Sequence, residues 1–376
     1  MTARQNKIVA FAALGLAGAL GLAACGGGTD NAAGGQNGGA SDNGGATSGA
    51  LSGQLAGAGA SSAEAAQAAW TQSFIALNPE AQVTYDAVGS GAGREQFLNG
   101  GVQFAGSDAA LTPEEITQSA NTCQGGKAFN VPVYISPIAV IYNLEGVDNL
   151  QLSPQTIAGI FSGQITKWND PKIAADNPDA TLPDLAIVPV HRSDDSGTTE
   201  NFTHYLSETA GDVWTHGEVE TWPVQGGQSG DGTSGLVKVV EGGNGTIGYA
   251  DASKAGNLGV AKIKVGEEFV EYSPEAAAKA VELSPRAEGR EEGDIVVELD
   301  RKLTDPSAYP LVLVSYLVLC DTYQDQATAD LVKGYANYIT SQEGQQASQE
   351  AAGNAPLTEK LSTDAKASID KIKAAS

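Results

Sequence analysis

The sequence has few basic residues, few cysteines and few histidines, and each shortage excludes a class of function. Lys and Arg together number 21 against 45 Asp and Glu, which gives a formal net charge of −24. A nucleic-acid-binding protein needs basic patches to displace counterions, so no nucleic acid is expected as a partner. The three histidines, His191, His204 and His216, lack metal-ligand spacing relative to cysteines or carboxylates. None of the four Gly/Ser-rich turns described below matches GxxxxGK[ST] or GxGxxG, so a nucleotide site is not expected, and neither a metal nor a cofactor is expected.

The first 25 residues contain a long apolar run but not one of membrane-spanning length. Arg4 and Lys7 precede 17 uncharged residues, Ile8 to Ala24, whereas a transmembrane helix needs about 20. Leu22-Ala23-Ala24 then leads directly to Cys25, which resembles the lipobox of bacterial lipoproteins. We therefore predict a lipoprotein signal peptide over 1–24 and lipidation of Cys25. The alternative is an ordinary signal peptide that happens to contain a cysteine.

A segment poor in large apolar side chains follows. Residues 26–53 include 11 glycines and no aromatic residue, so they cannot bury enough surface to offset chain entropy. We predict that 25–53 is a flexible tether on the lipid anchor, with a reach of roughly 30 Å. Beyond Cys25 the chain has only Cys123 and Cys320. In a secreted protein these two form either a disulfide or two buried thiols, and the disulfide is favoured.

The remaining chain is long enough for two globular domains, and strand-like runs alternate in it with helical patterns. The strands are predicted at 82–88, 102–105, 134–142, 186–190 and 311–319. Helices are predicted to start at Ser61 (a capping box with Glu64), Thr112, Ser153 and Ser196, and a further helix carries Val332, Tyr335 and Ile339. Segment 264–308 is charged and lacks strong apolar periodicity, which indicates a peripheral stretch.

Two apolar runs, 131–142 and 309–319, are the best candidates for the chain crossing between the domains. Each begins with a proline, Pro132 or Pro310, which fixes the local chain direction. We therefore expect an α/β protein of two lobes, with 54–132 plus 310–376 forming lobe I and 133–309 forming lobe II.

Four Gly/Ser-rich turns carry the candidate chemistry. They are Gly57-Ala58-Gly59-Ala60-Ser61-Ser62, Gly89-Ser90-Gly91-Ala92-Gly93, Ala105-Gly106-Ser107-Asp108 and His191-Arg192-Ser193-Asp194-Asp195-Ser196-Gly197-Thr198. Turns of this type present backbone N–H groups, hydroxyls and helix N-termini, and several of them together can enclose an anion without net positive charge. Each turn taken alone is more often only a helix cap.

These four segments, in this order, resemble the phosphate-binding proteins of ABC transporters, the PstS family. The resemblance continues through SPIAVIYN, FSGQITKWNDPKI, IVPVHRSD and GNGTIGYA, so it covers nearly the whole folded chain. It implies a periplasmic-binding-protein fold of type II, with two α/β lobes joined by two crossover strands and inorganic phosphate held between them. It also implies delivery of phosphate to the permease of an ABC importer at the outer face of the cell membrane, to which the lipid anchor attaches the receptor.

The resemblance also implies roles for individual residues. Hydrogen-bond donors to phosphate would come from Ser61, Ser62 (through its N–H), Ser90, Ser196, Gly197 and Thr198. Asp108 would accept from a phosphate hydroxyl, and Arg192, held by Asp194, would supply the cationic fork. Near neutral pH phosphate keeps a proton and sulfate does not, so an acceptor carboxylate can admit the first and reject the second.

The sequence departs from the family pattern at two positions. The family often has an aromatic residue at the position of Ser62 and a glycine at the position of Asp195. The first change is harmless if Ser62 contributes only its N–H. Asp195 adds a carboxylate beside the site, and it either points to solvent or weakens the affinity for an anion.

Three other interpretations of the function remain open from the sequence. His191, Asp195 and Ser196 could form a hydrolase triad, although no G-x-S-x-G motif occurs and neighbours on one turn rarely form the required relay. The ligand could be another oxyanion, such as molybdate, or a phosphoester. Finally, the chain could be a structural or adhesive surface lipoprotein, which would show no ligand-induced closure of its lobes.

Overall fold

The computed structural model describes residues 51–376, which form a mixed α/β fold. The predicted signal peptide and Cys25 lie outside the described residues. The strands are β1 (Gly53–Gly59), β2 (Ala81–Asp86), β3 (Phe104–Ser107), β4 (Ala128–Asn143), β5 (Gln151–Leu152), β6 (Val188–Arg192), β7 (Gln228–Gly230), β8 (Thr246–Asp251), β9 (Gly259–Val260), β10 (Lys262–Val265), β11 (Glu268–Val270), β12 (Val312–Cys320), β13 (Thr322–Tyr323) and β14 (Lys373–Ala374).

Helices flank these strands on both sides. They are α1 (Glu64–Leu77), α2 (Ser90–Leu98), α3 (Pro113–Gln118), α4 (Pro154–Phe161), α5 (Pro171–Asp176), α6 (Gly197–Ala210), α7 (Gly232–Glu241), α8 (Pro274–Leu283), α9 (Gln326–Thr340), α10 (Gln342–Ala352) and α11 (Glu359–Ile369), with a 3-10 turn, η1, at Ala252–Lys254. Among the described residues, no helix combines the length and the apolar character needed to cross a membrane.

The main sheet runs through both lobes. Its strand order is β2-β1-β3-β12-β4-β8-β6-β7, with β9 paired to β4. The strands β1, β2 and β3 are parallel, as are β8, β6 and β7, whereas β12 and β4 are antiparallel to their neighbours. The sheet therefore consists of two parallel edges joined by an antiparallel centre.

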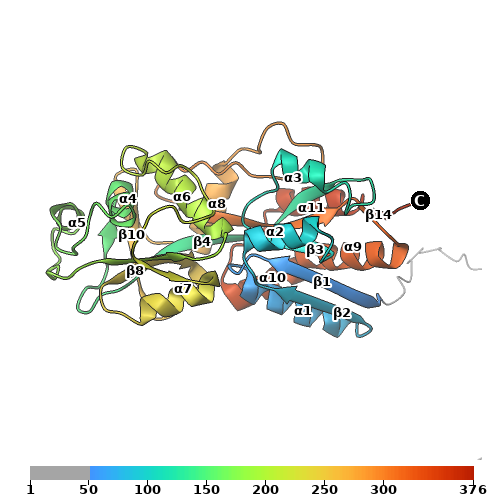
Figure 1. Ribbon diagram of the computed structural model, residues 1–376, viewed down its shortest axis with the longest axis horizontal. Coiled ribbons are helices and arrows are strands. Elements are labelled where there is room, and N and C mark those ends of the chain that lie inside the picture. The colour runs from blue at the N-terminus through green and yellow to red at the C-terminus, as the bar shows by residue number, and fades with distance from the viewer. Residues whose placement is uncertain (1–50) are drawn as a thin grey trace, which may run out of the picture. The chain divides into compact units, whose positions relative to one another are not determined.

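The long strand β4 connects the two lobes. Its first part pairs with β12, from Ala128 to Pro137, and its last part pairs with β8, from Ile138 to Asn143. Figure 1 shows α1, α2, α3 and the C-terminal helices at one end of β4 and α4 to α7 at the other. The second crossover lies beside the first, because Ile138 donates its N–H to the carbonyl of Leu311, just before β12 (2.8 Å). The expected α/β fold of two lobes joined by two crossover strands is confirmed.

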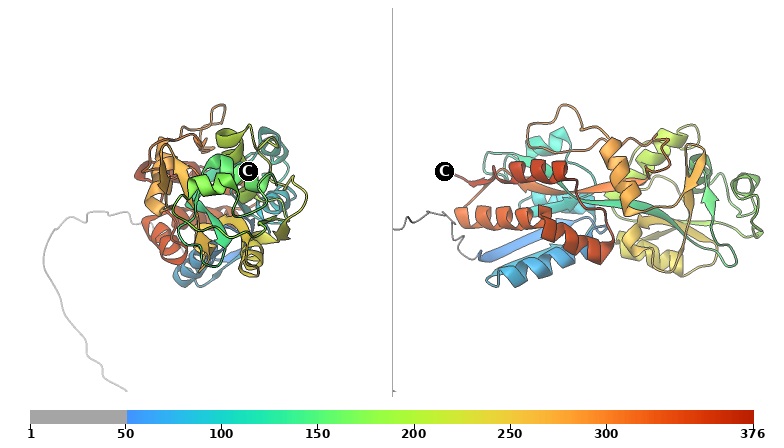
Figure 2. Two further views of the ribbon diagram at one scale, coloured as in Figure 1. Left: turned by 90° about the vertical axis from the view of Figure 1, so that its left-hand side faces the viewer. Right: turned by 180° about the vertical axis from the view of Figure 1, so that it is seen from behind.

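Lobe I combines the beginning and the end of the described chain. The C-terminal helices lie in the same lobe as β1 (Figure 2), where α9 contacts β1 and α10 contacts α1. Trp70 of α1 is fully buried and donates its indole N–H to the carbonyl of Gly344 in α10 (2.7 Å). A disulfide joins Cys123 to Cys320 at the end of β12, across 197 residues of sequence.

Most predicted elements are present, with shifted ends. Each of the five predicted strands overlaps an observed one: β2, β3, β4, β6 and β12. Thr112, Ser153 and Ser196 are the N-cap residues of α3, α4 and α6, as predicted, and Thr112 and Glu115 form a complete capping box. The remaining predicted helix is α9, in which Val332, Tyr335 and Ile339 are buried.

The capping box predicted at Ser61 and Glu64 is wrong. The N-cap of α1 is Ala63, and no side chain caps this helix. The Ser61 hydroxyl instead contacts Thr233 of lobe II, and Glu64 contacts Lys254 of the same lobe. Both side chains are therefore engaged with the opposite lobe instead of with their own helix end.

Two predicted boundaries change as well. β1 begins at Gly53, the last residue of the predicted tether, because Gly53 pairs with Ala81 of β2. Part of the segment assigned to lobe II packs on lobe I: Ile295 donates its N–H to the carbonyl of Asn130 (2.8 Å), and the Arg290 guanidinium donates to the Leu111 carbonyl (2.7 Å). We therefore assign residues 286–297 to lobe I. The other predicted boundaries between the lobes remain predictions.

Candidate functional site

The first turn of the site follows β1, where the chain passes very close to its neighbours. Gly59 has φ +146°, and a Cβ there would lie 1.9 Å from the Gly106 carbonyl oxygen. A Cβ on Gly93 of α2 would lie 2.3 Å from the Cα of Gly59. Only glycine fits both positions, and this close packing brings the start of α2 beside the end of β1.

The next two residues, Ser61 and Ser62, point in different directions. The Ser61 hydroxyl lies 3.0 Å from the Thr233 hydroxyl and accepts the Thr233 N–H, also at 3.0 Å, at the start of α7. The Ser62 hydroxyl contacts both carboxylate oxygens of Asp108, at 2.8 and 2.7 Å. One serine thus contacts the other lobe and the next contacts the acidic residue of its own lobe.

Asp108 lies at the end of β3, and its carboxylate is the buried acceptor of the cluster. It is 4% exposed and also accepts the Thr198 hydroxyl from lobe II (3.0 Å). Its own N–H donates to the hydroxyl of Ser90, the first residue of α2 (3.1 Å). Burial raises the pKa of Asp108 above its usual value, while hydrogen bonds from the hydroxyls and the charge of Arg192 lower it.

Arg192, at the end of β6, supplies the guanidinium. Its side chain is 3% exposed and forms a two-pronged ion pair with Asp194: Nε donates to Oδ1 (2.7 Å) and Nη2 to Oδ2. The same carboxylate accepts the Gly232 N–H at the start of α7 (3.1 Å). Asp194 thus orients the guanidinium and leaves Nη1 without a hydrogen-bond partner within residues 51–376.

The start of α6 lies directly against lobe I. Ser196 is the N-cap, and its hydroxyl accepts the Thr199 N–H (3.2 Å). A Cβ on Gly197 would lie 2.7 Å from the Ser90 hydroxyl and 2.8 Å from the Cβ of Asp108. Gly197 therefore allows the first turn of a helix, with its unpaired N–H groups, to reach the acidic residue of the other lobe.

These contacts, together with the links between neighbours along the chain, bring all nine predicted ligand residues into one cluster across the interface between the lobes, and all of them except the half-buried Asp194 are buried. The exposed Asp195, which departs from the family pattern, takes no part in it. Its carboxylate accepts the Thr221 hydroxyl (2.5 Å), and its carbonyl accepts the Gly91 N–H (3.2 Å). Of the two alternatives for Asp195, the structure supports the one in which the carboxylate points to solvent.

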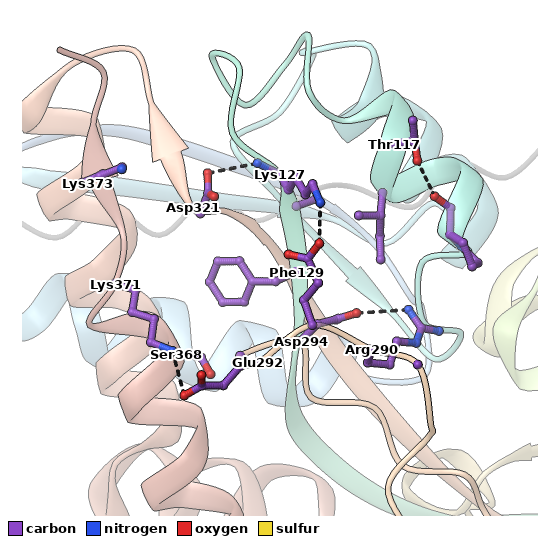
Figure 3. Close-up of a pocket in the computed structure, with 16 residues that line it drawn as sticks. Thr117, Lys127, Phe129, Arg290, Glu292, Asp294, Asp321, Ser368, Lys371 and Lys373 are labelled. Carbon is purple, nitrogen blue, oxygen red and sulfur yellow. Dashed lines mark hydrogen bonds and ion pairs between the residues drawn. The ribbon is translucent and has the colours of Figure 1, made fainter.

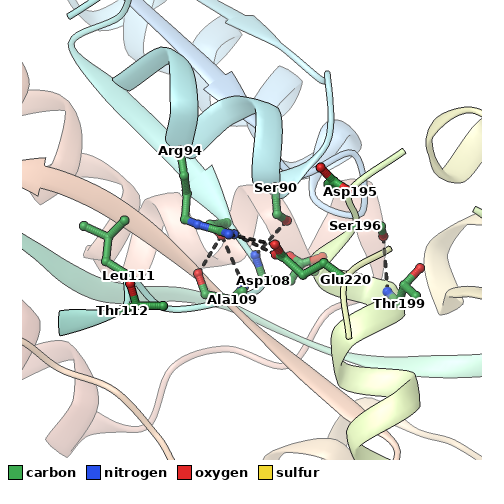
Figure 4. Close-up of polar contacts among 12 residues, drawn as sticks. Ser90, Arg94, Asp108, Ala109, Leu111, Thr112, Asp195, Ser196, Thr199 and Glu220 are labelled. Atoms are coloured by element: carbon green, nitrogen blue, oxygen red, sulfur yellow. Dashed lines mark hydrogen bonds and ion pairs between the residues drawn. The ribbon is translucent and has the colours of Figure 1, made fainter. Parts of the chain in front are cut away.

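Beside the cluster, the two lobes are joined by an ion pair that the sequence did not reveal. The Arg94 guanidinium of α2 donates to both carboxylate oxygens of Glu220 in lobe II, at 2.7 and 2.8 Å (Figure 4). Within lobe I, Arg94 also donates to Glu115 (3.0 Å). Glu220 in turn accepts the Ser196 N–H through its carbonyl (3.2 Å), so the ion pair is directly connected to the start of α6.

Sequence reasoning missed further residues of the site. Gly232 and Thr233 open α7, and Asn201 of α6 donates to the Asp108 carbonyl (2.9 Å). The one available signal was the Gly230-Asp231-Gly232-Thr233 segment, another glycine-rich helix start. For Asn201 the sequence contains no such signal, because Asp108, its partner at the site, lies 93 residues away along the chain.

A separate pocket of about 400 Å³ lies in lobe I, between α3, β4 and the loop 289–294 (Figure 3). Three of its four basic side chains are paired with carboxylates: Lys127 with Glu291, Arg290 with Asp294 and Lys371 with Glu292. None of the nine predicted ligand residues lines this pocket. Within residues 51–376, no group of three or more His, Cys, Asp or Glu side chains is arranged to hold a metal ion.

The chemistry of the cluster suits an anion, and most of its hydrogen-bond donors are neutral groups. It contains one guanidinium, whose charge Asp194 offsets, one acceptor carboxylate, and hydroxyl and helix N-terminal donors from both lobes. Charge-assisted hydrogen bonds contribute about 1.5–3 kcal/mol each, so five or six of them exceed the roughly 8 kcal/mol that micromolar binding requires, even after the cost of association. Two lobes that meet over such a cluster define a solute-binding protein.

Comparison with known proteins gives the same class. The family model of the PBP superfamily domain matches residues 44–343. A solved high affinity periplasmic phosphate-binding protein (PfluDING), bound with phosphate, superimposes with a TM-score of 0.68 at 23% identity, over 84% of this chain and 93% of that chain. This likeness shows the fold.

Closer relatives define the family. The chain is 33% identical over 329 residues to the phosphate-binding protein PstS 2 of Mycobacterium tuberculosis, covering 85% of this chain and 87% of that protein. It is 36% identical over 266 residues to PstS 3 of Mycobacterium leprae, covering 68% and 70%. The chain belongs to the PstS family of phosphate-binding proteins.

Proposed function

We propose that this protein captures inorganic phosphate between its two lobes and delivers it to the permease of an ABC importer. The observation that carries the proposal is the buried cluster, in which a single acceptor carboxylate, Asp108, accepts the Thr198 hydroxyl at the start of α6 and lies within the electrostatic influence of Arg192. The names of the relatives, all phosphate-binding proteins, agree with it.

In this proposal the nine residues divide the work by chemistry. Arg192 donates to phosphate while Asp194 holds its orientation, and Asp108 accepts the phosphate hydroxyl. The donors are the hydroxyls and N–H groups of Ser61, Ser62, Ser90, Ser196, Gly197 and Thr198. The two lobes supply complementary parts of the site, so phosphate is fully surrounded only when the lobes are together.

The test is a calorimetric titration of the purified protein with phosphate, sulfate and molybdate. We expect phosphate to bind in the micromolar range or tighter and sulfate to bind far more weakly. Asp108→Asn should narrow the ratio of the two affinities, because an amide can donate to an oxyanion that carries no proton. Absence of phosphate binding to the wild-type protein contradicts the function. An unchanged ratio in the variant contradicts only the role of Asp108.

The contacts around His191 do not favour the hydrolase. The His191 ring stacks on Trp222, with centroids 5.1 Å apart, and its Nδ1 lies 2.8 Å from the Arg192 carbonyl oxygen. The Ser196 hydroxyl caps α6, so its lone pairs are directed to its own helix. We infer that the protein is a receptor and not an enzyme. Turnover of p-nitrophenyl phosphate that is lost in Ser196→Ala would contradict this.

For the location, we propose an extracytoplasmic receptor attached to the membrane through lipidated Cys25. The support is sequence alone: the apolar run, the Leu22-Ala23-Ala24-Cys25 sequence and the glycine-rich segment after it. Cys25→Ser should release the protein from the membrane fraction. Continued retention of that variant contradicts the anchor.

A further inference from the structure

A charged residue is completely buried where the crossover strand β12 begins. Arg301 is 2% exposed and lies in a stretch without helix or strand, inside the segment that the sequence predicts to be peripheral. Burial lowers the pKa of its guanidinium to about 10, so the group still carries its charge at neutral pH. Burying a charge is costly unless polar partners surround it, and the partners of Arg301 therefore need to be identified.

Those partners are oxygen atoms of uncharged groups. Nη1 donates to the carbonyls of Pro310 (2.9 Å) and Val312 (2.7 Å), and Nη2 donates to the side-chain carbonyl of Asn201 (2.5 Å). Nε has no partner in the described part of the chain. Arg301 thus ties one of the two crossovers to helix α6.

Asn201 passes this connection on to the site. Its Nδ2 donates to the carbonyl of Asp108 in lobe I and to the carbonyl of Gly197 in lobe II, both at 2.9 Å. These contacts determine the orientation of the amide. In the flipped orientation, the amide oxygen would face two carbonyl oxygens and the NH2 group would face the guanidinium. Arg301 thus holds Asn201 in the orientation that bridges the two lobes.

We propose that Arg301 and Asn201 are positioning residues that hold the acceptor carboxylate of Asp108 against the first turn of α6. The pair thereby connects the crossover strand to the phosphate site and sets how long the lobes stay together around the ligand. This inference rests on the proposed function, because its readout is phosphate binding. Neither side chain belongs to the set that contacts phosphate in that proposal.

One substitution reverses both of these contacts and keeps the shape of the side chain. Asn201→Asp leaves an acceptor for Arg301 but replaces the Nδ2 donor with an oxygen that faces the carbonyls of Asp108 and Gly197. The two hydrogen bonds become repulsive contacts at the interface between the lobes. We expect phosphate affinity to fall about tenfold or more, mainly through faster dissociation, because the repulsion acts on the closed arrangement.

Asn177 supplies a matched control. Asn177 and Asn201 are both 7% exposed. Like Asn201, Asn177 donates through Nδ2 to two carbonyls, those of Gln151 (2.7 Å) and Ile173 (2.8 Å). Both carbonyls lie in lobe II, away from the cluster. Asn177→Asp should reduce the stability to urea by an amount comparable to that of Asn201→Asp, yet leave the phosphate dissociation rate within about twofold.

The experiment measures phosphate affinity by calorimetry, dissociation by stopped-flow fluorescence and unfolding by urea, for the wild type and both variants. If Asn201→Asp alters phosphate dissociation no more than Asn177→Asp does, the inference is overturned while the proposed function stands. If the wild type does not bind phosphate, both fail. Should Asn201→Asp not fold, Arg301→Lys decides: it keeps the charge but cannot reach all three oxygens, and dissociation as slow as in the wild type overturns the inference.

Discussion

Arg192 and Arg94 both lie at the interface between the lobes, and each forms a two-pronged ion pair with a carboxylate. The partner of Arg192 is Asp194, two residues further along the same turn, whereas the partner of Arg94 is Glu220 in the other lobe. The first pair moves as one body when the lobes separate, so it can only orient a guanidinium. The second pair must break, so it can favour closure. The same kind of ion pair therefore orients a side chain at Arg192–Asp194 and favours closure of the lobes at Arg94–Glu220.

The surroundings of Glu220 reinforce this difference. Burial and the nearby charge of Glu220 raise the pKa of Glu200 well above its usual value, so Glu200 keeps its proton at neutral pH. Burial opposes ionisation of Glu220 too, but Arg94 outweighs it and lowers the pKa of Glu220. Arg94 keeps Glu115 as a partner inside lobe I. Separation of the lobes thus leaves Glu220 as the group that loses its charge partner.

The largest effect on phosphate binding is expected at the Arg192–Asp194 pair. Arg192→Ala removes the only guanidinium among the nine proposed ligand residues, and with it the charge-assisted hydrogen bonds that we propose it donates to the anion. These contribute about 1.5–3 kcal/mol each, so phosphate affinity should fall about a hundredfold or more. Calorimetry measures the loss of affinity. Arg192→Lys keeps the charge but not the two-pronged geometry, so its affinity for phosphate should lie between those of the wild type and Arg192→Ala. A dissociation constant within threefold of the wild type would show that this guanidinium does not hold the anion.

A smaller effect on phosphate binding is expected at the Arg94–Glu220 pair. Glu220→Gln keeps the shape but removes the charge that Arg94 meets across the interface, so phosphate should leave about tenfold faster, with its preference over sulfate unchanged. The matched control is Glu115→Gln, which removes the other carboxylate partner of Arg94 without touching lobe II. Stopped-flow dissociation rates compare the two. Equal rates for both variants would mean that the pairing across the interface does not favour closure.

The smallest effect is expected at a second ion pair between the lobes. Lys254 contacts Glu64 at 2.8 Å, but their side chains are 25% and 48% exposed. Exposed pairs contribute about 0–1 kcal/mol and are screened by salt. Lys254→Met should therefore change phosphate dissociation less than threefold, and the change should vanish at high salt. A larger, salt-resistant change would mean that exposure does not separate this pair from Arg94–Glu220.

Much of the architecture could be predicted from sequence, because its signals are local. Thr112 with Glu115, Ser153 and Ser196 mark helix starts through neighbours within one turn, and β4 and β12 are continuous apolar runs. Strand β1 gave no such signal. It is built from glycine, alanine and leucine around Gln54, and only its pairing with β2 and β3 makes it a strand.

By itself, the sequence determined the family, the alternation of helices and strands, and the side chains that gather at the site. It could do so because turns such as His191–Thr198 place their donors, guanidinium and carboxylate within a few residues of one another. Only the tertiary structure decided which groups meet across the lobes: Ser61 with Thr233, Arg94 with Glu220 and Arg301 with Asn201. These partners are separated by 100 or more residues, so packing of the two lobes, and no local spacing, brings them together.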